Sequence, residues 1–323
     1  MKKILFALCA MATLASCSNE EIVNFDKEAI AFDGAFVDNG TRADDSFTIE
    51  TSELLAFDVW ATTQRPSSTE IVPIMEKVEV SRATASAAWG YGAAYTQYWI
   101  PGNTYQFVAA KNYETVTLTD GVPSQFTYDA ADQLDLIYAA DTRVGMEAGA
   151  NAPVAFTFDH LLSKAYFTVD TNAMSGANAN YTYRITNVCI NNAVKEATYT
   201  VDGATWAGAA YYTAQDPLEF NNVKVGEKLV ADRVYTSDDA RLLIPASYTD
   251  LNITCTIETL YDESVIDVQN YNKTIAQSFV KGFVYNFVLA LKDPGQPIEF
   301  TVTRVNEWIP TGNTYNETPI PGL

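Results

Sequence analysis

Apolar and polar residues alternate at every second position along much of this chain, and this pattern limits its fold more than any other sequence feature. Residues 253–257 (ITCTI) and 167–169 (FTV) are examples. Successive side chains of a β-strand point to opposite faces of its sheet, so such segments predict strands with one buried face and one solvated face. This arrangement is typical of antiparallel sheets in sandwiches, whereas the strands of parallel α/β sheets are uniformly apolar.

The remaining strand signals and the turn signals agree with this fold class. No amphipathic helix longer than about three turns is expected, the best candidates being residues 129–136 and 238–242. Clusters such as Pro101-Gly102-Asn103 supply turn residues at intervals suited to a sandwich. Short runs rich in Val, Ile, Thr, Tyr and Phe predict strands at 54–61, 105–109, 154–158, 165–169, 181–185, 251–257 and 283–291. The sequence therefore predicts an all-β protein.

The chain is long enough for two domains. It has 323 residues, of which 48% are hydrophobic, and so can bury one or two sizeable cores. We predict two tandem antiparallel β-sandwich domains, at residues 43–150 and 151–323, with the boundary in the small-residue segment 147–153. Residues 173–180 are also rich in Gly, Ala and Asn, but alternating runs flank them closely, so we interpret them as a loop within the second domain.

The N-terminus carries a targeting segment, which we predict to be a signal peptide over residues 1–16. A basic start at Lys2 and Lys3 precedes an apolar run, 4–14, that is too short to cross a bilayer, and small residues follow it. Cys17 comes directly after Leu-Ala-Ser, which resembles the lipobox of bacterial lipoproteins. That resemblance implies a mature chain beginning at an acylated Cys17. The alternative is plain secretory cleavage near Ser16, with an incidental cysteine.

Charge and cysteine content restrict the environment and the partners. The chain has 20 basic and 40 acidic residues, and loss of Lys2 and Lys3 moves the net charge from −20 to −22 (18 − 40). So acidic a surface argues against nucleic acid or anionic lipid as a partner. Cys189 and Cys255 both lie in apolar runs. They can pair or be buried and free, and we favour the latter because a bridge requires suitably placed neighbouring strands. No metal-ligand spacing or cofactor motif is found.

The sequence offers little for catalysis. His160 is the single histidine, and no spacing announces partners for a triad or a metal site, so we interpret it as a satisfied residue at a strand end. Ser163 and Asp159 lie too near it along one strand for the usual catalytic geometry. Acidic pairs such as Asp132 and Asp135 arise by chance in so acidic a chain. We predict that the protein is not an enzyme.

An ordered series of short motifs resembles the fimbrillins of Bacteroidetes type V pili, including the Mfa-like lipoproteins. The resemblance covers roughly residues 30–308 and rests on FDVW at 57–60, YWIPGNTYQF at 98–107, DLIYA at 135–139, VAFTFDHLLSK at 154–164, KGFVYNF at 281–287, residues 298–302 and Trp308. It implies two transthyretin-like β-sandwich domains and a cell-surface or outer-membrane location. The acidic run Ser-Asn-Glu-Glu after Cys17 likewise resembles the surface-export signal of lipoproteins in that phylum. The implied partners are other pilin subunits, the outer membrane through the lipid anchor, and an unidentified host or bacterial ligand.

The resemblance also implies assembly by strand exchange. In fimbrillins the precursor's N-terminal strand fills a groove until an arginine-directed protease removes it, and a neighbour's C-terminal strand is thought to replace it. Here the leader would be residues 17–42, with Ile30, Phe32 and Phe36 on one face of a strand at 29–37 and cleavage between Arg42 and Ala43. Before this resemblance is considered, Arg42 can equally be a solvated loop charge.

The candidate donor strand is at 298–305, with the apolar residues Ile298, Phe300 and Val302. The breaker cluster at 293–297 would let this strand detach from the second domain. The segment fits equally well as the ordinary last strand of the second sandwich, with Trp308 closing the core.

A different class of function stays open, that of a surface glycan-binding lipoprotein. Aromatic residues are dense at Trp89, Tyr91, Tyr95, Tyr98 and Trp99, and exposed rings of this kind could form a stacking platform for sugars. The simpler interpretation, which we prefer, is that this segment packs over the groove or forms an edge of the first domain.

Overall fold

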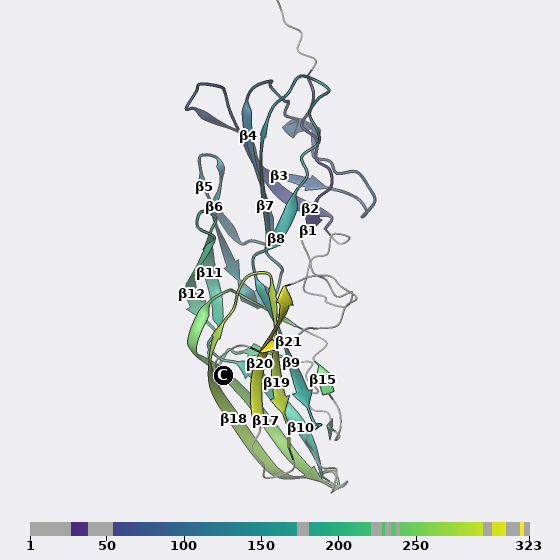
Figure 1. The fold of residues 1–323 in the computed structure, drawn as a ribbon, viewed down its shortest axis with the longest axis vertical. Helices are drawn as coiled ribbons and strands as arrows, with labels where there is room; N and C mark the ends of the chain where they lie inside the picture. The colour runs from purple at the N-terminus through teal and green to yellow at the C-terminus, as the bar shows by residue number, and fades with distance from the viewer. Residues whose placement is uncertain are drawn as a thin grey trace, which may run out of the picture.

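The computed structural model consists almost entirely of strands, arranged as two β units stacked along the long axis (Figure 1). It describes residues 27–37, 54–172, 181–220, 228–229, 234–236, 240–292, 299–307 and 317–319. The helical elements within this part of the chain are two short 3-10 turns, Ala93–Tyr95 and Ala130–Asp132. The all-β prediction is therefore confirmed. No helix among these residues is long and apolar enough to span a membrane.

The first unit is built on a six-stranded sheet. Adjacent strands of this sheet run antiparallel to each other, except for β1 and β8, which run parallel. In sheet order the strands are β1 (Phe36–Val37), β8 (Thr157–His160), β7 (Ile137–Val144), β4 (Thr104–Lys111), β2 (Ala56–Gln64) and β3 (Ile71–Ser81).

Both faces of this sheet are buried near its centre. On β4, Val108 and Ala110 belong to one core cluster, whereas Tyr105, Phe107 and Ala109 belong to another. A four-stranded antiparallel sheet supplies residues of the first cluster. In order it comprises β12 (Thr205–Tyr211), β11 (Val194–Thr200), β6 (Val122–Asp129) and β5 (Thr115–Thr119). The opposite face is covered by the N-terminal segment, which forms the candidate site below.

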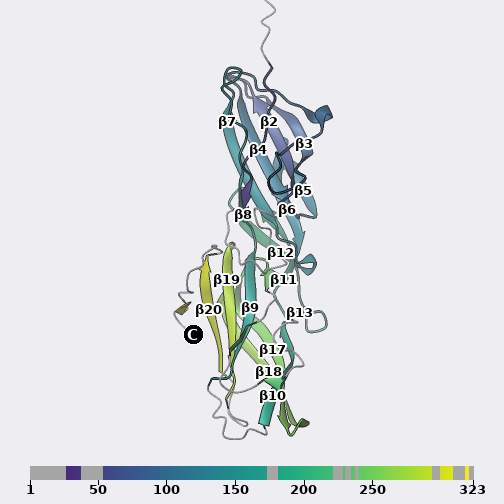
Figure 2. The ribbon, with the colours of Figure 1, turned by 90° about the vertical axis from the view of Figure 1, so that its right-hand side faces the viewer.

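The second unit contains two further sheets (Figure 2). One has the order β13 (Leu218–Glu219), β10 (Tyr181–Ile190), β17 (Ser247–Tyr261) and β18 (Ser264–Ser278), and β14 (Lys228–Leu229) also pairs with β10. The other has the order β15 (Val234–Thr236), β9 (Ser163–Asp170), β19 (Phe283–Ala290), β20 (Glu299–Glu307) and β21 (Glu317–Pro319), and β16 (Arg241–Leu243) also pairs with β9. Phe167 and Phe287 stack at 4.9 Å between ring centroids in the core of this unit.

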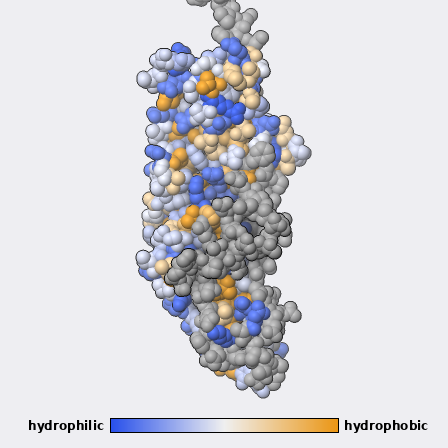
Figure 3. All heavy atoms as spheres, viewed as in Figure 1, coloured by the Kyte–Doolittle hydropathy of each residue, from blue (hydrophilic) through white to orange (hydrophobic). Residues whose placement is uncertain are grey.

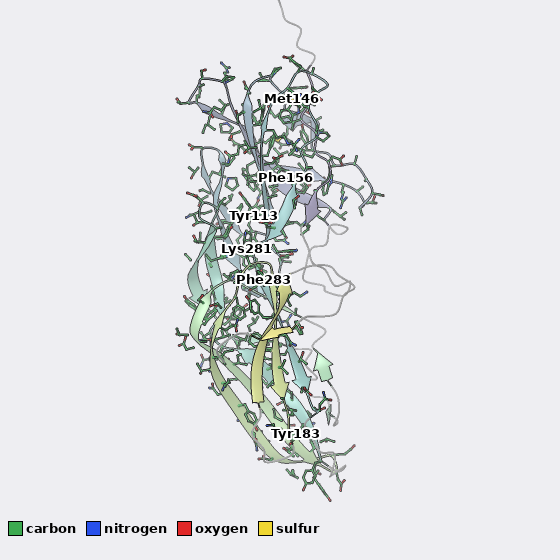
Figure 4. The ribbon with its side chains drawn as sticks, in the orientation of Figure 1. Tyr113, Met146, Phe156, Tyr183, Lys281 and Phe283 are labelled. Carbon is green, nitrogen blue, oxygen red and sulfur yellow. The ribbon has the colours of Figure 1, made fainter. Side chains whose placement is uncertain are left out.

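The division between the two units differs from the predicted boundary at 150/151. Strand β8 pairs with β7 in the first sheet, and Phe158 is buried in the first unit's core together with Phe156, which is labelled in Figure 4. Strand β11, which lies within the predicted second domain, pairs with β6 of the first unit, and β12 pairs with the other edge of β11. Alternation along the sequence identifies a strand but not its partner, because partners are chosen by packing between distant segments. The chain first enters the second unit at β9.

Polar side chains connect elements at the junction of the units. Gln133 donates to the Leu242 carbonyl at 3.2 Å and accepts from the Leu242 amide at 2.8 Å. His160 Nδ1 lies 2.7 Å from Asp135 Oδ2, and both side chains are buried. His160 is the last residue of β8, so its predicted place at a strand end is confirmed. The helix candidate at 129–136 contains only the 3-10 turn Ala130–Asp132, and β16 (Arg241–Leu243) overlaps the last two residues of the other candidate, 238–242.

Cys189 and Cys255 are buried and free, as favoured from the sequence. They lie on the neighbouring strands β10 and β17, where Cys189 is opposite Thr254 and Cys255 is opposite Val188. Opposed residues share a face and successive residues alternate, so the two thiols point to opposite faces of the sheet. Burial raises the pKa of Cys189 to about 11 and that of Cys255 to about 12. Both side chains therefore stay thiols at neutral pH.

Candidate functional site: the groove that holds the N-terminal strand

Residues 27–37, which we call the leader strand, are hydrogen-bonded on both sides. On one side the Ile30 amide donates to the Gln97 carbonyl at 2.8 Å, and the Trp99 amide donates to the Glu28 carbonyl at 3.0 Å. On the other side, Val154 exchanges backbone hydrogen bonds with Ala31 and Asp33. Strand β1, at the end of this segment, then runs parallel to β8. The segment thus fills a position between two other parts of the first unit, as an inserted strand would.

The leader strand buries one row of side chains against the sheet. Ile30 is 1% exposed and Phe32 is 6% exposed, as their even spacing predicts. The Phe32 ring centroid lies 5.6 Å from that of Tyr91, 6.0 Å from that of Phe156 and 6.3 Å from that of Phe107. Four different segments of the first unit thus meet at this one ring.

The alternation changes phase in the middle of the leader strand. Gly34 has φ +60°, a conformation that favours glycine, and after it the odd positions Ala35 and Val37 are buried. The predicted single apolar face over Ile30, Phe32 and Phe36 is therefore interrupted at Gly34, and the side chain of Phe36 lies outside the described residues.

Aromatic side chains from residues 89–99 cover the leader strand. Tyr91 donates its hydroxyl hydrogen to the Ile30 carbonyl at 2.7 Å, and burial raises the pKa of Tyr91. Trp99 is 7% exposed and packs edge-to-face on Tyr105, at 4.7 Å between centroids. Trp89 packs on Phe57 at 4.8 Å. Three of the rings thus pack in or against the core cluster that contains Ile30 and Phe32, whereas Tyr95 and Tyr98 are exposed.

A carboxylate fixes the point where the leader strand enters the groove. Glu28 Oε2 accepts from the Asn151 side-chain amide at 2.6 Å and from the Gly149 amide at 2.9 Å. These bonds lower the pKa of Glu28, the Asn151 bond having the largest effect. Lys27 lies over the exposed Tyr98 ring at 5.6 Å. Segments 27–28, 98–99 and 149–151 are thereby tied together at one end of the unit, near the labelled Met146 in Figure 4.

The structure describes only some of the residues predicted for lipidation, for proteolytic cleavage and for the donor strand. Cys17, Arg42, Ala43 and Ile298 lie outside the described residues. Phe300 and Val302 lie on β20, opposite Leu289 and Phe287 of β19. Strand β21 pairs with the other edge of β20. The candidate donor segment thus occupies a position in the second unit's own sheet, and a donor role stays a prediction.

A second concavity, of about 370 Å³, is lined in part by Tyr113, which is labelled in Figure 4. Three of its lining residues contact one another: Tyr113 donates a hydrogen bond to Asp58, and Lys77 lies near both residues. Burial raises the pKa of Tyr113, and the hydrogen bond to Asp58 and its negative charge raise it further. Within the described part of the chain, no group of three or more His, Cys, Asp or Glu side chains could hold a metal ion. On the face drawn in Figure 3, hydrophilic and hydrophobic residues are intermixed over the coloured part.

The fold matches solved structures of low sequence identity. A fimbrial protein from Bacteroides vulgatus is 16% identical with a TM-score of 0.58, covering 78% of this chain and 92% of that one. Two proteins designated as cell adhesion proteins also match. The one from Bacteroides uniformis is 18% identical with a TM-score of 0.51, covering 87% of this chain and 99% of its own. The one from Bacteroides ovatus is 15% identical with a TM-score of 0.51, covering 88% and 98%.

Sequence comparison places the chain more directly. A search of curated proteins finds no match. The profile of the fimbrillin-like family, by contrast, matches residues 41–308, which is most of the chain and agrees with the motif series in the sequence. This protein belongs to the fimbrillin-like family.

Proposed function

We propose that this protein is a structural or adhesive subunit of a cell-surface pilus, assembled by proteolytic removal of the leader strand and strand exchange between subunits. The observation that carries the proposal is the leader strand itself, which is hydrogen-bonded on both sides and buries Ile30, Phe32 and Val37. Its removal would leave an apolar groove flanked by unpaired backbone groups. Such a groove is a template for a strand from another chain.

The donor in this proposal is the C-terminal segment with Ile298, Phe300 and Val302. Burying a large apolar side chain contributes roughly 1.5–3 kcal/mol, so three such residues can replace the burial given by Ile30, Phe32 and Val37. Exchange would then be nearly neutral in apolar burial. The donor must first leave β19, with which β20 is paired here. We therefore expect donation to be coupled to opening of this edge of the second unit.

Controlled proteolysis tests the proposal. Purified chain treated with a low dose of an arginine-directed protease is expected to give a ladder of multimers on a denaturing gel. N-terminal sequencing of the ladder should begin at Ala43, since Arg42 lies in a Gly- and Asp-rich stretch suited to cleavage. A product that starts at Ala43 but remains entirely monomeric would contradict strand exchange.

The same proposal places the precursor at the outer membrane through acylated Cys17. Replacing Cys17 by Ala should release the protein from the membrane fraction, because the acyl chains that hold it would be absent. Ser16→Ala is the matched control, because it keeps a small residue before the cysteine and should leave fractionation unchanged. Membrane association of the Cys17→Ala protein at the level of the unaltered chain would contradict lipid anchoring.

A further inference from the structure

Strand β18 is a long strand with one open edge. It has 15 residues, well above the usual length of about five or six, and lies at the end of its sheet. Within the described part of the chain, β17 is the one strand that pairs with it. In Figure 1 it follows the outer margin of the second unit. Its free backbone groups can therefore pair with another strand.

The edge is weakly protected against such pairing. Natural edge strands are commonly blocked by Pro, by several charges or by bulges. Strand β18 contains no Pro and only two charged residues, Asp267 and Lys273. A bulge at its turn end, beside Ile266, precedes a regular stretch in which Asp267 to Ile275 pair with Thr259 to Leu251 without interruption. This regular stretch is long enough to act as a template.

The two charges are placed symmetrically about Asn270. If two copies of β18 pair in antiparallel orientation about a two-fold axis at Asn270, residue 267 of each copy lies opposite residue 273 of the other. Opposed residues of an antiparallel pair share a face, so the Asp267 carboxylate of each copy would lie beside the Lys273 ammonium group of the other. The two-fold axis makes two such ion pairs in the dimer. Both side chains are exposed. Asp267 already accepts a hydrogen bond from Gln269 at 2.7 Å, which holds it on the edge.

The same charges disfavour other registers. A symmetric pairing centred on residue 267 would set the two Asp267 carboxylates against each other, and one centred on 273 would oppose the two lysines. Parallel in-register pairing brings like charges together as well. Like charges directly opposite one another destabilise a pair of strands, so the pattern selects the register centred on Asn270.

We propose that β18 is a lateral pairing surface through which two copies of this chain associate, edge to edge and antiparallel, about Asn270. Exposed Val268 would gain a cross-strand neighbour in Asn272 of the second copy. The contact involves neither the leader strand nor the donor segment. It is thus independent of strand exchange, and only its use in joining fibres side by side rests on the proposed pilus function.

Reversing the charges at positions 267 and 273 tests the proposal. The full, uncleaved chain is used, because strand exchange does not occur in it. Sedimentation equilibrium should detect a dimer of the unaltered protein. Lys273→Glu or Asp267→Lys should each raise the dimer dissociation constant by about tenfold or more, because both symmetric contacts become repulsive. The double variant Asp267→Lys/Lys273→Asp restores opposite charges and should return the constant to near its original value. Arg65→Glu, which changes the charge equally at an exposed site of the first unit, should have no effect.

Disulfide cross-linking of variants with one introduced cysteine tests whether the two-fold axis of the dimer lies at Asn270. Asn270→Cys places one thiol opposite its symmetry mate, at a separation that a disulfide can bridge, whereas Asn272→Cys places the thiols on opposite sides of the axis. Oxidation should cross-link the first variant and not the second. A monomeric unaltered protein, charge reversals without effect, no recovery in the double variant, or equal cross-linking of both cysteine variants would overturn the proposal. None of these results would bear on removal of the leader strand.

Discussion

Replacing Arg42 by Ala is expected to abolish assembly while leaving the chain folded and secreted. The uncut leader strand is part of the same molecule as its groove, so its effective concentration there is of the order of millimolar or higher. A neighbour's strand at micromolar concentration would be outcompeted by about a thousandfold. The bonds made by Ile30, Trp99 and Val154 persist in this variant. Assembly is measured as the gel ladder after protease treatment, and as fibres on the cell surface.

The matched control for this variant is Arg65→Ala. Arg65 is an exposed arginine at a turn between β2 and β3, so its loss removes a protease site of the same chemistry without touching the leader. This control should assemble like the unaltered chain. If the Arg42→Ala protein forms fibres as well as the unaltered chain does, release of a strand at this position is not the assembly step.

The position of most strands, and the face of each strand that is buried, could be predicted from the alternation of apolar and polar residues. The segment 251–257 (LNITCTI) alternates cleanly, and β17 has its odd-numbered residues Leu251, Ile253, Cys255 and Ile257 buried. A two-residue period reports only on which side of one strand is covered. It does not report the partner strand, so it does not predict that β8 pairs with β7 across the expected boundary at 150/151. Pairing between β11 and β6 likewise joins segments that no local pattern connects.

The leader strand illustrates the same limit at the candidate site. Its apolar residues identified it as a strand, but one glycine with positive φ shifted the buried row from even to odd positions. The contacts of Glu28 with Asn151 and Gly149 carried no sequence signal, because the two segments lie more than one hundred residues apart. Dense aromatic residues at 89–99 did signal packing, and three of them cover the leader strand or its surroundings.

Phe32→Ala is expected to release the leader strand from the cleaved protein about 100- to 4000-fold faster. Cutting after Arg42 frees one end of the leader strand, but its side chains stay in the groove until a neighbour displaces them. Truncating a buried Phe to Ala typically costs about 3–5 kcal/mol, through lost burial and the cavity left behind. Phe32 is 6% exposed and contacts Tyr91, Phe107 and Phe156, so a cost in this range is expected. Each 1.4 kcal/mol corresponds to about tenfold in an equilibrium constant, and changes at one interface appear mainly in the dissociation rate.

Two further variants make this prediction specific. Phe32→Leu removes less volume and should accelerate release by an intermediate factor, which guards against a Phe32→Ala chain that fails to fold. Ala31→Ser alters an exposed neighbour whose carbonyl still accepts from Val154, so it should leave the rate unchanged. Release is followed by gel filtration of the cleaved 17–42 fragment, and assembly by the ladder under the same conditions. If release is the slow step, the ladder should form faster in the same order, Ala before Leu before Phe. A release rate for Phe32→Ala within about threefold of the unaltered chain would mean that burial of this ring does not hold the leader strand in place.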